Sequence, residues 1–185
     1  GVIRFHGKPV RDSRHGGYGE ISAARVFEVS SNVGIVKLIN ENYGENPQKF
    51  VDGLKRLCVN QKIGLPIKGE GEPKIPNPKD KKTWNGLSLP WMAYGYGVSI
   101  TPLQTLTFYN AIANNGEMVK PRFVREIRAQ GHVVSSYEKE VIHPQICSQE
   151  TIDQVKVMME NVVRRGTADN IYDPNFSMAG KTGTC

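Results

Sequence analysis

The order of its periodic segments constrains the fold of this chain more than any other feature. Apolar residues at helical spacing predict helices near Ser22, within SSNVGIVKLINENYG and from the Asn46-Pro47 pair onward. A further helix is expected from Thr101, and then come strand-like runs, a long helix from Ser148 and a final strand. Helices first and strands later are typical of an α+β fold with an antiparallel sheet and a helical cluster.

Two of the predicted helices carry clear end signals. Thr101 and Gln104 form a capping box, and Asn115-Gly116 marks the end of the helix that they begin. The long helix that starts after Ser148 stops before Gly166.

The strand signals lie mainly in the second half of the chain. Gln130-Gly131 joins the strand-like runs 118–129 and 132–137 as a hairpin. Small residues dominate the stretch 175–185, which predicts a strand that another backbone approaches closely.

A Pro- and Lys-rich stretch at 64–86 interrupts this pattern and predicts a long exposed loop inside a single domain that spans residues 1–185. Such a loop is either a solvated linker or a segment that borders a cleft or a partner surface, and the sequence leaves both interpretations open.

Composition excludes several classes of protein. A hydrophobic content of 38% with 23% charged residues is that of a soluble globular chain. The formal charge of +6 (24 basic minus 18 acidic) is too diffuse for a nucleic-acid binder. The cysteines, Cys58, Cys147 and Cys185, have neither disulfide-framework nor zinc-site spacing, and no metal is predicted.

The run AGKTGTC at 179–185 invites a nucleotide-binding interpretation that its surroundings exclude. A phosphate loop needs a glycine five residues before the Gly-Lys pair, and that position is Asn175, preceded by Pro174. No helix follows either, because Gly183 comes almost at once.

The alternative is a K-T-G element, Lys181-Thr182-Gly183, as used by serine acyltransferases that act on β-lactam-like substrates. The lysine would supply positive potential beside a serine hydroxyl, and the glycine would leave room for a substrate along the strand. The hydroxyls of Thr182 and Thr184 would bind a substrate carboxylate, and a strand N–H would face the oxyanion.

Such an element requires partners elsewhere in the chain, and Ser30-Ser31-Asn32 supplies one. Ser30 could relay a proton to a leaving amine, and the Asn32 amide could hold a substrate carbonyl. The competing interpretation is that Ser30 or Ser31 only caps the next helix.

Together these stretches resemble the transpeptidase domain of penicillin-binding proteins, most closely the class B type. The resemblance rests on SSNVG, AGKTGT, YGYGVSITPLQTLTFYNAIANNGEMVKPRFV and MMENVVRRGTA, in the family's order. It implies a serine β-lactamase-like fold, here truncated at both ends, and a serine D,D-transpeptidase that cross-links peptidoglycan stem peptides and is trapped by β-lactams.

The resemblance also implies a site and a setting. Catalytic roles fall to Ser30, Asn32 and Lys181, and substrate binding to these residues with Thr182, Gly183 and Thr184, whose N–H would form half of the oxyanion hole. No cofactor is implied. The bacterial parent would lie on the extracytoplasmic face of the membrane, held by an N-terminal helix absent from this chain, among cell-wall synthesis and division proteins.

The family's nucleophile motif, S-x-x-K, has no match upstream of Ser30, because Ser13 and Ser22 lack the lysine. The one match, Ser136 to Lys139, follows a predicted hairpin strand and violates the family's order, so we interpret it as a decoy. We expect this piece to be inactive alone and to self-associate through exposed strand edges.

Two alternatives stay open at this point. One is a hydrolase of the same fold, a D,D-carboxypeptidase or β-lactamase, and the other is a non-catalytic β-lactam sensor or scaffold module.

Overall fold

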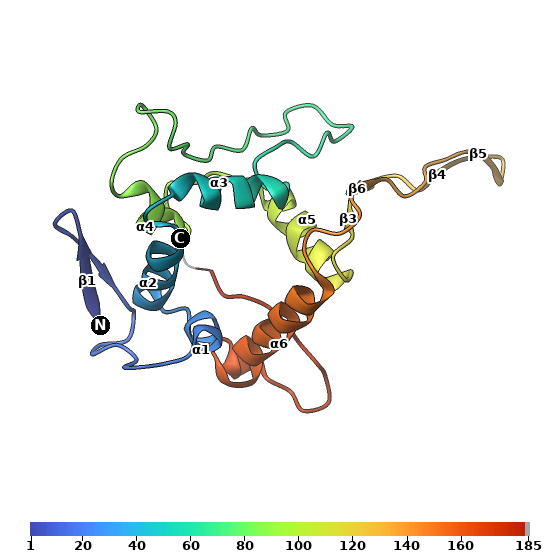
Figure 1. The fold of residues 1–185 in the computed structure, drawn as a ribbon. Helices are drawn as coiled ribbons and strands as arrows, with labels where there is room; N and C mark the ends of the chain where they lie inside the picture. Colours follow the sequence, from blue (N-terminus) through green and yellow to red (C-terminus); the bar gives the residue numbers. More distant parts are fainter. Residues whose placement is uncertain (184–185) are drawn as a thin grey trace. The chain divides into compact units, whose positions relative to one another are not determined.

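The computed structural model describes residues 1–183, and Figure 1 traces its elements along the chain. Contacts divide the chain into two compact units. Unit 1 comprises Gly1–Gly53, Ile75–Val98 and the segment from Asp153 onward, and unit 2 comprises Leu54–Lys74 and Ser99–Ile152.

Unit 1 begins with an antiparallel hairpin of β1 (Val2–Phe5) and β2 (Lys8–Arg11) and is otherwise helical. Its helices are α1 (Ala23–Glu28), α2 (Asn32–Tyr43), most of α3 (Pro47–Arg56), α4 (Ser88–Met92), most of α6 (Gln149–Arg165) and the 3-10 turn η1 (Asp169–Ile171). Helix α2 packs against α1, α4 and β2.

The core of unit 1 is built from branched aliphatic side chains on these helices. Val36 of α2 and Val162 of α6 are completely buried, and Val163 and Val51 are nearly so. Burial of each such side chain stabilises the fold by about 1.5–3 kcal/mol relative to its exposure.

Unit 2 is organised around α5 (Pro102–Ala113), which carries the predicted capping box. The Gln104 backbone N–H donates to Thr101 Oγ1 (3.1 Å), and the Thr101 N–H donates to Gln104 Oε1 (2.7 Å). Two antiparallel pairs complete the unit, β3 (Met118–Val119) with β6 (Val141–His143), and β4 (Glu126–Ala129) with β5 (His132–Ser136).

The predicted α+β class is confirmed, and so are the helices at both capping signals and the hairpin at Gln130-Gly131. Among the described residues, the antiparallel sheet consists of three separate two-stranded pairs. Helix α4 and strand β6 were not expected from the sequence, because both are only a few residues long.

Two strand predictions need correction. The run 118–129 is not continuous, because β3 ends at Val119 and β4 begins at Glu126. Pro121 lies in the gap, and a proline has no N–H to donate to a ladder.

The expected strand at 175–185 is absent as far as residue 183, and the rest lies outside the described residues. This segment lies against α6 instead, and the Gly180 N–H donates to the Met159 carbonyl of that helix (3.1 Å). Because the backbone groups of a helix are paired within the helix, α6 offers no ladder with which a strand could pair.

The stretch 64–86 contains no helix, and its one strand-like contact is an isolated bridge between Lys74 and Ser99. Its first part is ordered by Glu70, whose carboxylate accepts hydrogen bonds from the backbone N–H groups of Ile63 (2.6 Å), Gly64 (3.0 Å) and Leu65 (3.0 Å). Within residues 1–183, no helix has the length and apolar character needed to cross a membrane.

Candidate functional site

A polar contact between residues far apart in the sequence joins Ser30 to Lys181. The Lys181 ammonium donates to Ser30 Oγ across 151 positions, and it also donates to the Thr182 carbonyl (3.2 Å). Lys181 Nζ lies 5.7 Å from the centre of the Phe27 ring, at cation–π distance. The structure therefore brings together the two elements that the sequence pairs, the serine triplet and the K-T-G run.

Ser30 sits in the junction between α1 and α2 in a strained backbone conformation. Its φ is 52°, in the left-handed region, which costs a residue with a Cβ of the order of 1 kcal/mol or more. The junction is held by two backbone hydrogen bonds, from Ser30 N–H to the Phe27 carbonyl (3.2 Å) and from Ser31 N–H to the Val26 carbonyl (3.0 Å). Strain of this kind persists where the surrounding structure enforces it.

The helix-cap interpretation applies to Ser31 and not to Ser30. Ser31 Oγ accepts from the Gly34 N–H (3.0 Å) as the N-cap of α2 and donates to the Asp12 carboxylate (2.9 Å). Asp12 also accepts from the Val33 N–H (3.1 Å). Because Ser31 provides the cap, the Ser30 hydroxyl is left to face Lys181.

A buried carboxylate lies two positions before Ser30. Glu28 is completely buried and accepts hydrogen bonds from Arg165 Nη2 (2.8 Å) and Arg25 Nη1 (3.0 Å). Burial alone would raise the pKa of Glu28, but the hydrogen bonds and charges of Arg165 and Arg25 outweigh it and hold the pKa below its usual value. Glu28 thus ties α1 to the end of α6.

The backbone reinforces the same connection. The Thr167 N–H donates to the Glu28 carbonyl (3.2 Å), directly after the end of α6. A Cβ at Gly166 would lie 2.3 Å from that carbonyl, so only glycine permits this approach.

Hydroxyl groups extend the Ser30–Lys181 contact. Thr182 Oγ1 lies 3.5 Å from Ser30 Oγ and 2.6 Å from Thr167 Oγ1. Glu28, Arg165 and Thr167 were not singled out in the sequence, although RRGTA was part of the resemblance. No local pattern distinguishes Arg165 from an ordinary basic residue in the last turn of a helix.

Lys181 is half-buried, and burial lowers its pKa from the ordinary lysine value. An ammonium with a lowered pKa gives up a proton more readily, and this one lies beside the Ser30 hydroxyl.

The other predicted site residues are less closely grouped. The Asn32 side-chain amide donates to the Arg11 carbonyl (2.9 Å). Gly183 is exposed and a Cβ there would meet open space. Thr184 lies outside the described residues.

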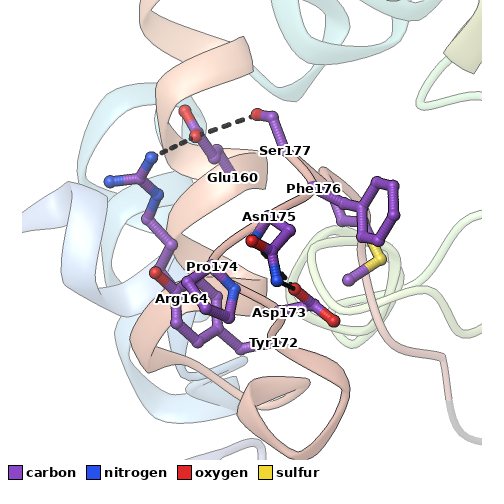
Figure 2. A pocket seen from close by; sticks show the side chains of 9 residues that line it. Glu160, Arg164, Tyr172, Asp173, Pro174, Asn175, Phe176 and Ser177 are labelled. Carbon is purple, nitrogen blue, oxygen red and sulfur yellow. Dashed lines mark hydrogen bonds and ion pairs between the residues drawn. The ribbon is translucent and has the colours of Figure 1, made fainter.

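A separate cavity of about 120 Å³ lies between α6 and the segment that leads to Lys181 (Figure 2). No predicted site residue lines it. Glu160 accepts hydrogen bonds from Arg164 (2.8 Å) and Ser177 (3.1 Å), and Asp173 accepts from the Asn175 backbone (2.8 Å). The hydrogen bond from Ser177 to Glu160 connects the segment before Lys181 to α6.

The S-x-x-K match lies in unit 2 and has a different environment. Ser136 is the last residue of the exposed strand β5, and Lys139 donates to both carboxylate oxygens of Glu117 (2.8 and 3.1 Å). The described residues contain no His, Cys, Asp and Glu cluster that could hold a metal ion.

The site thus places a serine hydroxyl beside a lysine ammonium on an α+β scaffold. The family model of the penicillin binding protein transpeptidase domain matches residues 6–185, and the chain belongs to this family.

Relatives of known name support the same family assignment. The chain is 31% identical over its whole length to penicillin-binding protein PbpB of Mycobacterium tuberculosis and 29% identical to stage V sporulation protein D of Bacillus subtilis. It spans only 27% and 28% of the lengths of these two proteins.

Solved structures extend the agreement to the fold. Penicillin-binding protein 3 of Mycobacterium tuberculosis in its apo form superimposes with a TM-score of 0.83 at 31% identity, covering all of this chain and 42% of that one. Its complex with ampicillin gives a TM-score of 0.82 at 31% identity, covering 99% of this chain and 40% of that one. The D,D-transpeptidase domain of the peptidoglycan glycosyltransferase from Eggerthella lenta superimposes with a TM-score of 0.81. The superposition covers 99% of this chain and 46% of that one, and at 24% identity it is evidence for the fold only.

Proposed function

We propose that this chain forms two walls of the acyl-transfer site of a class B peptidoglycan D,D-transpeptidase, whose serine nucleophile belongs to a part of the protein outside these 185 residues. The observation that carries the proposal is the contact between the Lys181 ammonium and Ser30 Oγ. Family membership over residues 6–185 supplies the context in which this contact acts.

In the proposed reaction, the nucleophilic serine gives its proton to the lysine of its own S-x-x-K motif, outside these 185 residues, and attacks the carbonyl between the two D-Ala residues of a stem peptide. The C–N bond breaks, the acyl group stays on the serine, and the terminal D-Ala leaves as an amine that must gain a proton. Ser30 donates that proton, and its oxygen is reprotonated from the neighbouring Lys181 ammonium, which lies within hydrogen-bond reach.

Substrate binding falls to the remaining residues. The Lys181 charge and the hydroxyls of Thr182 and Thr184 attract the substrate carboxylate, and the exposed Gly183 leaves space for the peptide beside them. An amide NH₂ carries two hydrogens, so Asn32 can hold a substrate carbonyl while it donates to Arg11. The Thr184 N–H supplies half of the oxyanion hole.

A fluorescent penicillin tests whether the acylated serine lies outside this chain. We expect the 185-residue chain to show no covalent label and the full-length protein to be labelled at a serine outside this chain. A label mapped by peptide mass to Ser136 of the isolated chain would overturn the division of the site proposed here.

The fate of the acyl group is tested in the full-length protein with a stem-peptide donor and an amine acceptor. A transpeptidase yields the cross-linked product, whereas release of the acyl group to water alone would make the protein a carboxypeptidase or β-lactamase-like hydrolase. We further propose that the parent works outside the cytoplasmic membrane with other cell-wall synthesis and division proteins.

A further inference from the structure

The hairpin of β4 and β5 leaves strand edges unpaired in unit 2. The two strands pair with each other through a turn at Gln130 (φ 50°) and Gly131 (φ 82°), and no third described strand joins them (Figure 1). An isolated two-stranded hairpin is marginally stable in water, and additional strands stabilise it.

The backbone groups on the outer edge of β4 can be identified from one hydrogen bond. The Tyr137 N–H donates to the Arg125 carbonyl (2.9 Å), so the backbone groups of Arg125 face β5. Because these groups alternate in direction along an antiparallel strand, those of Glu126 and Arg128 face away from β5. The ladder irregularity places its extra residue on β5, since Ile127 pairs with Ser135 and Arg128 with Val133, so β4 itself stays regular.

We propose that β4 is a homotypic interaction surface, on which β4 of a second copy of this chain pairs antiparallel about a twofold axis at Ile127. In this register Glu126 lies opposite Arg128 of the second copy, and the reverse pair forms on the other side of the axis. Each pair exchanges two backbone hydrogen bonds through the outward-facing N–H and C=O groups. The product is a four-stranded antiparallel sheet.

Charge selects both the partner and the register. Within one chain, Glu126 Oε1 already contacts Arg128 Nη2 (2.8 Å), so the two side chains share a face of the strand. A second copy would complete an alternating square of four charges, and opposite charges directly across a ladder are stabilising. A shift of the axis to Glu126 or to Arg128 would place like charges opposite each other. A single-signed edge would repel its own copy, whereas the order Glu-Ile-Arg is complementary to itself.

The apolar side chain at the axis adds to the interaction. Ile127 is 47% exposed, and in the paired form it would lie against Ile127 of the second copy at the close spacing of a non-hydrogen-bonded pair. The contact is far smaller than a standard protein interface, so we expect a reversible, concentration-dependent dimer.

The test uses sedimentation velocity of this chain over a wide concentration range. We expect a monomer–dimer equilibrium for the unchanged chain and a dissociation constant about tenfold or more higher for Arg128→Glu and for Glu126→Arg, because each turns two attractive cross-strand pairs into repulsive ones. Arg125→Glu is the matched control. It changes the net charge as Arg128→Glu does, but Arg125 would lie opposite Ala129 and not opposite a charge, so we expect less than about a twofold change.

Mixing the two single variants separates the proposed contact from any effect within one chain. A strand with two glutamates is complementary to a strand with two arginines, so the mixture should form a heterodimer more tightly than either variant dimerises alone. A monomeric unchanged chain, single variants that dimerise as the unchanged chain does, or a mixture that stays monomeric would each overturn the proposal. Circular dichroism melts check that every variant is folded.

Discussion

The site around Ser30 and Lys181 in unit 1, called the corner below, consists of Glu28, Ser30, Thr167, Lys181 and Thr182. It is held by contacts between residues distant in the sequence, whereas the β4–β5 hairpin of unit 2 is held by contacts between neighbouring residues. Around Ser30 and Lys181, the buried Glu28 carboxylate and the Lys181 ammonium join segments more than a hundred residues apart. In the hairpin every residue of β5 is exposed, and the two strands contact mainly each other. Substitutions at the corner should therefore affect a distant group, whereas substitutions in the hairpin should have only local effects.

The largest effect is expected from Lys181→Ala in the full-length protein. Loss of the ammonium removes both the proton source for Ser30 and the charge that attracts the substrate carboxylate, so the second-order rate constant of acylation by a fluorescent penicillin should fall about 100-fold or more. Lys139→Ala is the matched control, because Lys139 contacts Glu117 in unit 2 and belongs to the S-x-x-K match that we interpret as a decoy. Equal losses for both variants would contradict the proposed site.

Glu28→Gln should cause the largest loss of stability among conservative changes at the corner. The variant leaves the hydrogen bonds of Arg165 and Arg25 without a charged acceptor, and we expect the free energy of unfolding in urea to fall by about 2 kcal/mol. Glu126→Gln is the comparison in the hairpin, where a partly exposed ion pair with Arg128 is replaced. A change within about 0.5 kcal/mol is expected there, and a loss as large as that of Glu28→Gln would show that the two regions do not differ as described.

The stabilisation by Glu28 should depend on pH in a defined direction. Its pKa in the folded chain lies below the ordinary value of 4.5, so the stabilisation is fully present above that value and is lost as the pH falls through the folded pKa. The difference in unfolding free energy between the unchanged chain and Glu28→Gln should therefore be constant above about pH 5.5 and shrink in acid. A difference that grows below pH 4.5 would mean that the carboxylate is not stabilised by Arg165 and Arg25.

Thr167→Val removes a hydroxyl at the far end of the chain of hydroxyl groups. Thr182 then loses a hydrogen bond of 2.6 Å, and we expect acylation of the full-length protein to slow about tenfold because Thr182 is less well positioned for the substrate carboxylate. Thr167→Ser keeps the hydroxyl and should restore most of the rate. If both variants slow acylation equally while their thermal stability is unchanged, the hydroxyl of Thr167 is not what matters.

The same contrast explains which parts of the molecule could be predicted from the sequence. The capping box of Thr101 and the turn at Gln130-Gly131 depend on residues within a few positions of each other, and both were predicted correctly. Ser30 and Lys181 were paired because a K-T-G element requires a serine triplet elsewhere in the chain, since nothing in their local sequence connects them. Glu28 and Arg165 could not be predicted, because a buried ion pair is defined by the packing of two helices and not by local spacing. The expected C-terminal strand was wrong as far as residue 183, because a strand depends on its neighbour and this segment lies against α6.

The smallest effect is expected from Val134→Ala in β5, and it tests the comparison most directly. Val134 is 66% exposed and is the extra residue at the irregularity of the ladder, so little apolar surface is lost and the free energy of unfolding should change by less than about 0.5 kcal/mol. Val162→Ala removes the same two methyl groups from a fully buried position of α6 and should lower the free energy of unfolding by about 2 kcal/mol.

Amide hydrogen exchange supplies a second measurement of the difference between β5 and α6. The amides of β5 should exchange through local opening and be insensitive to Val162→Ala, whereas the buried turns of α6 should exchange faster in that variant. If β5 becomes less protected together with α6, the hairpin unfolds with the rest of the chain, and its exposure does not make it independent.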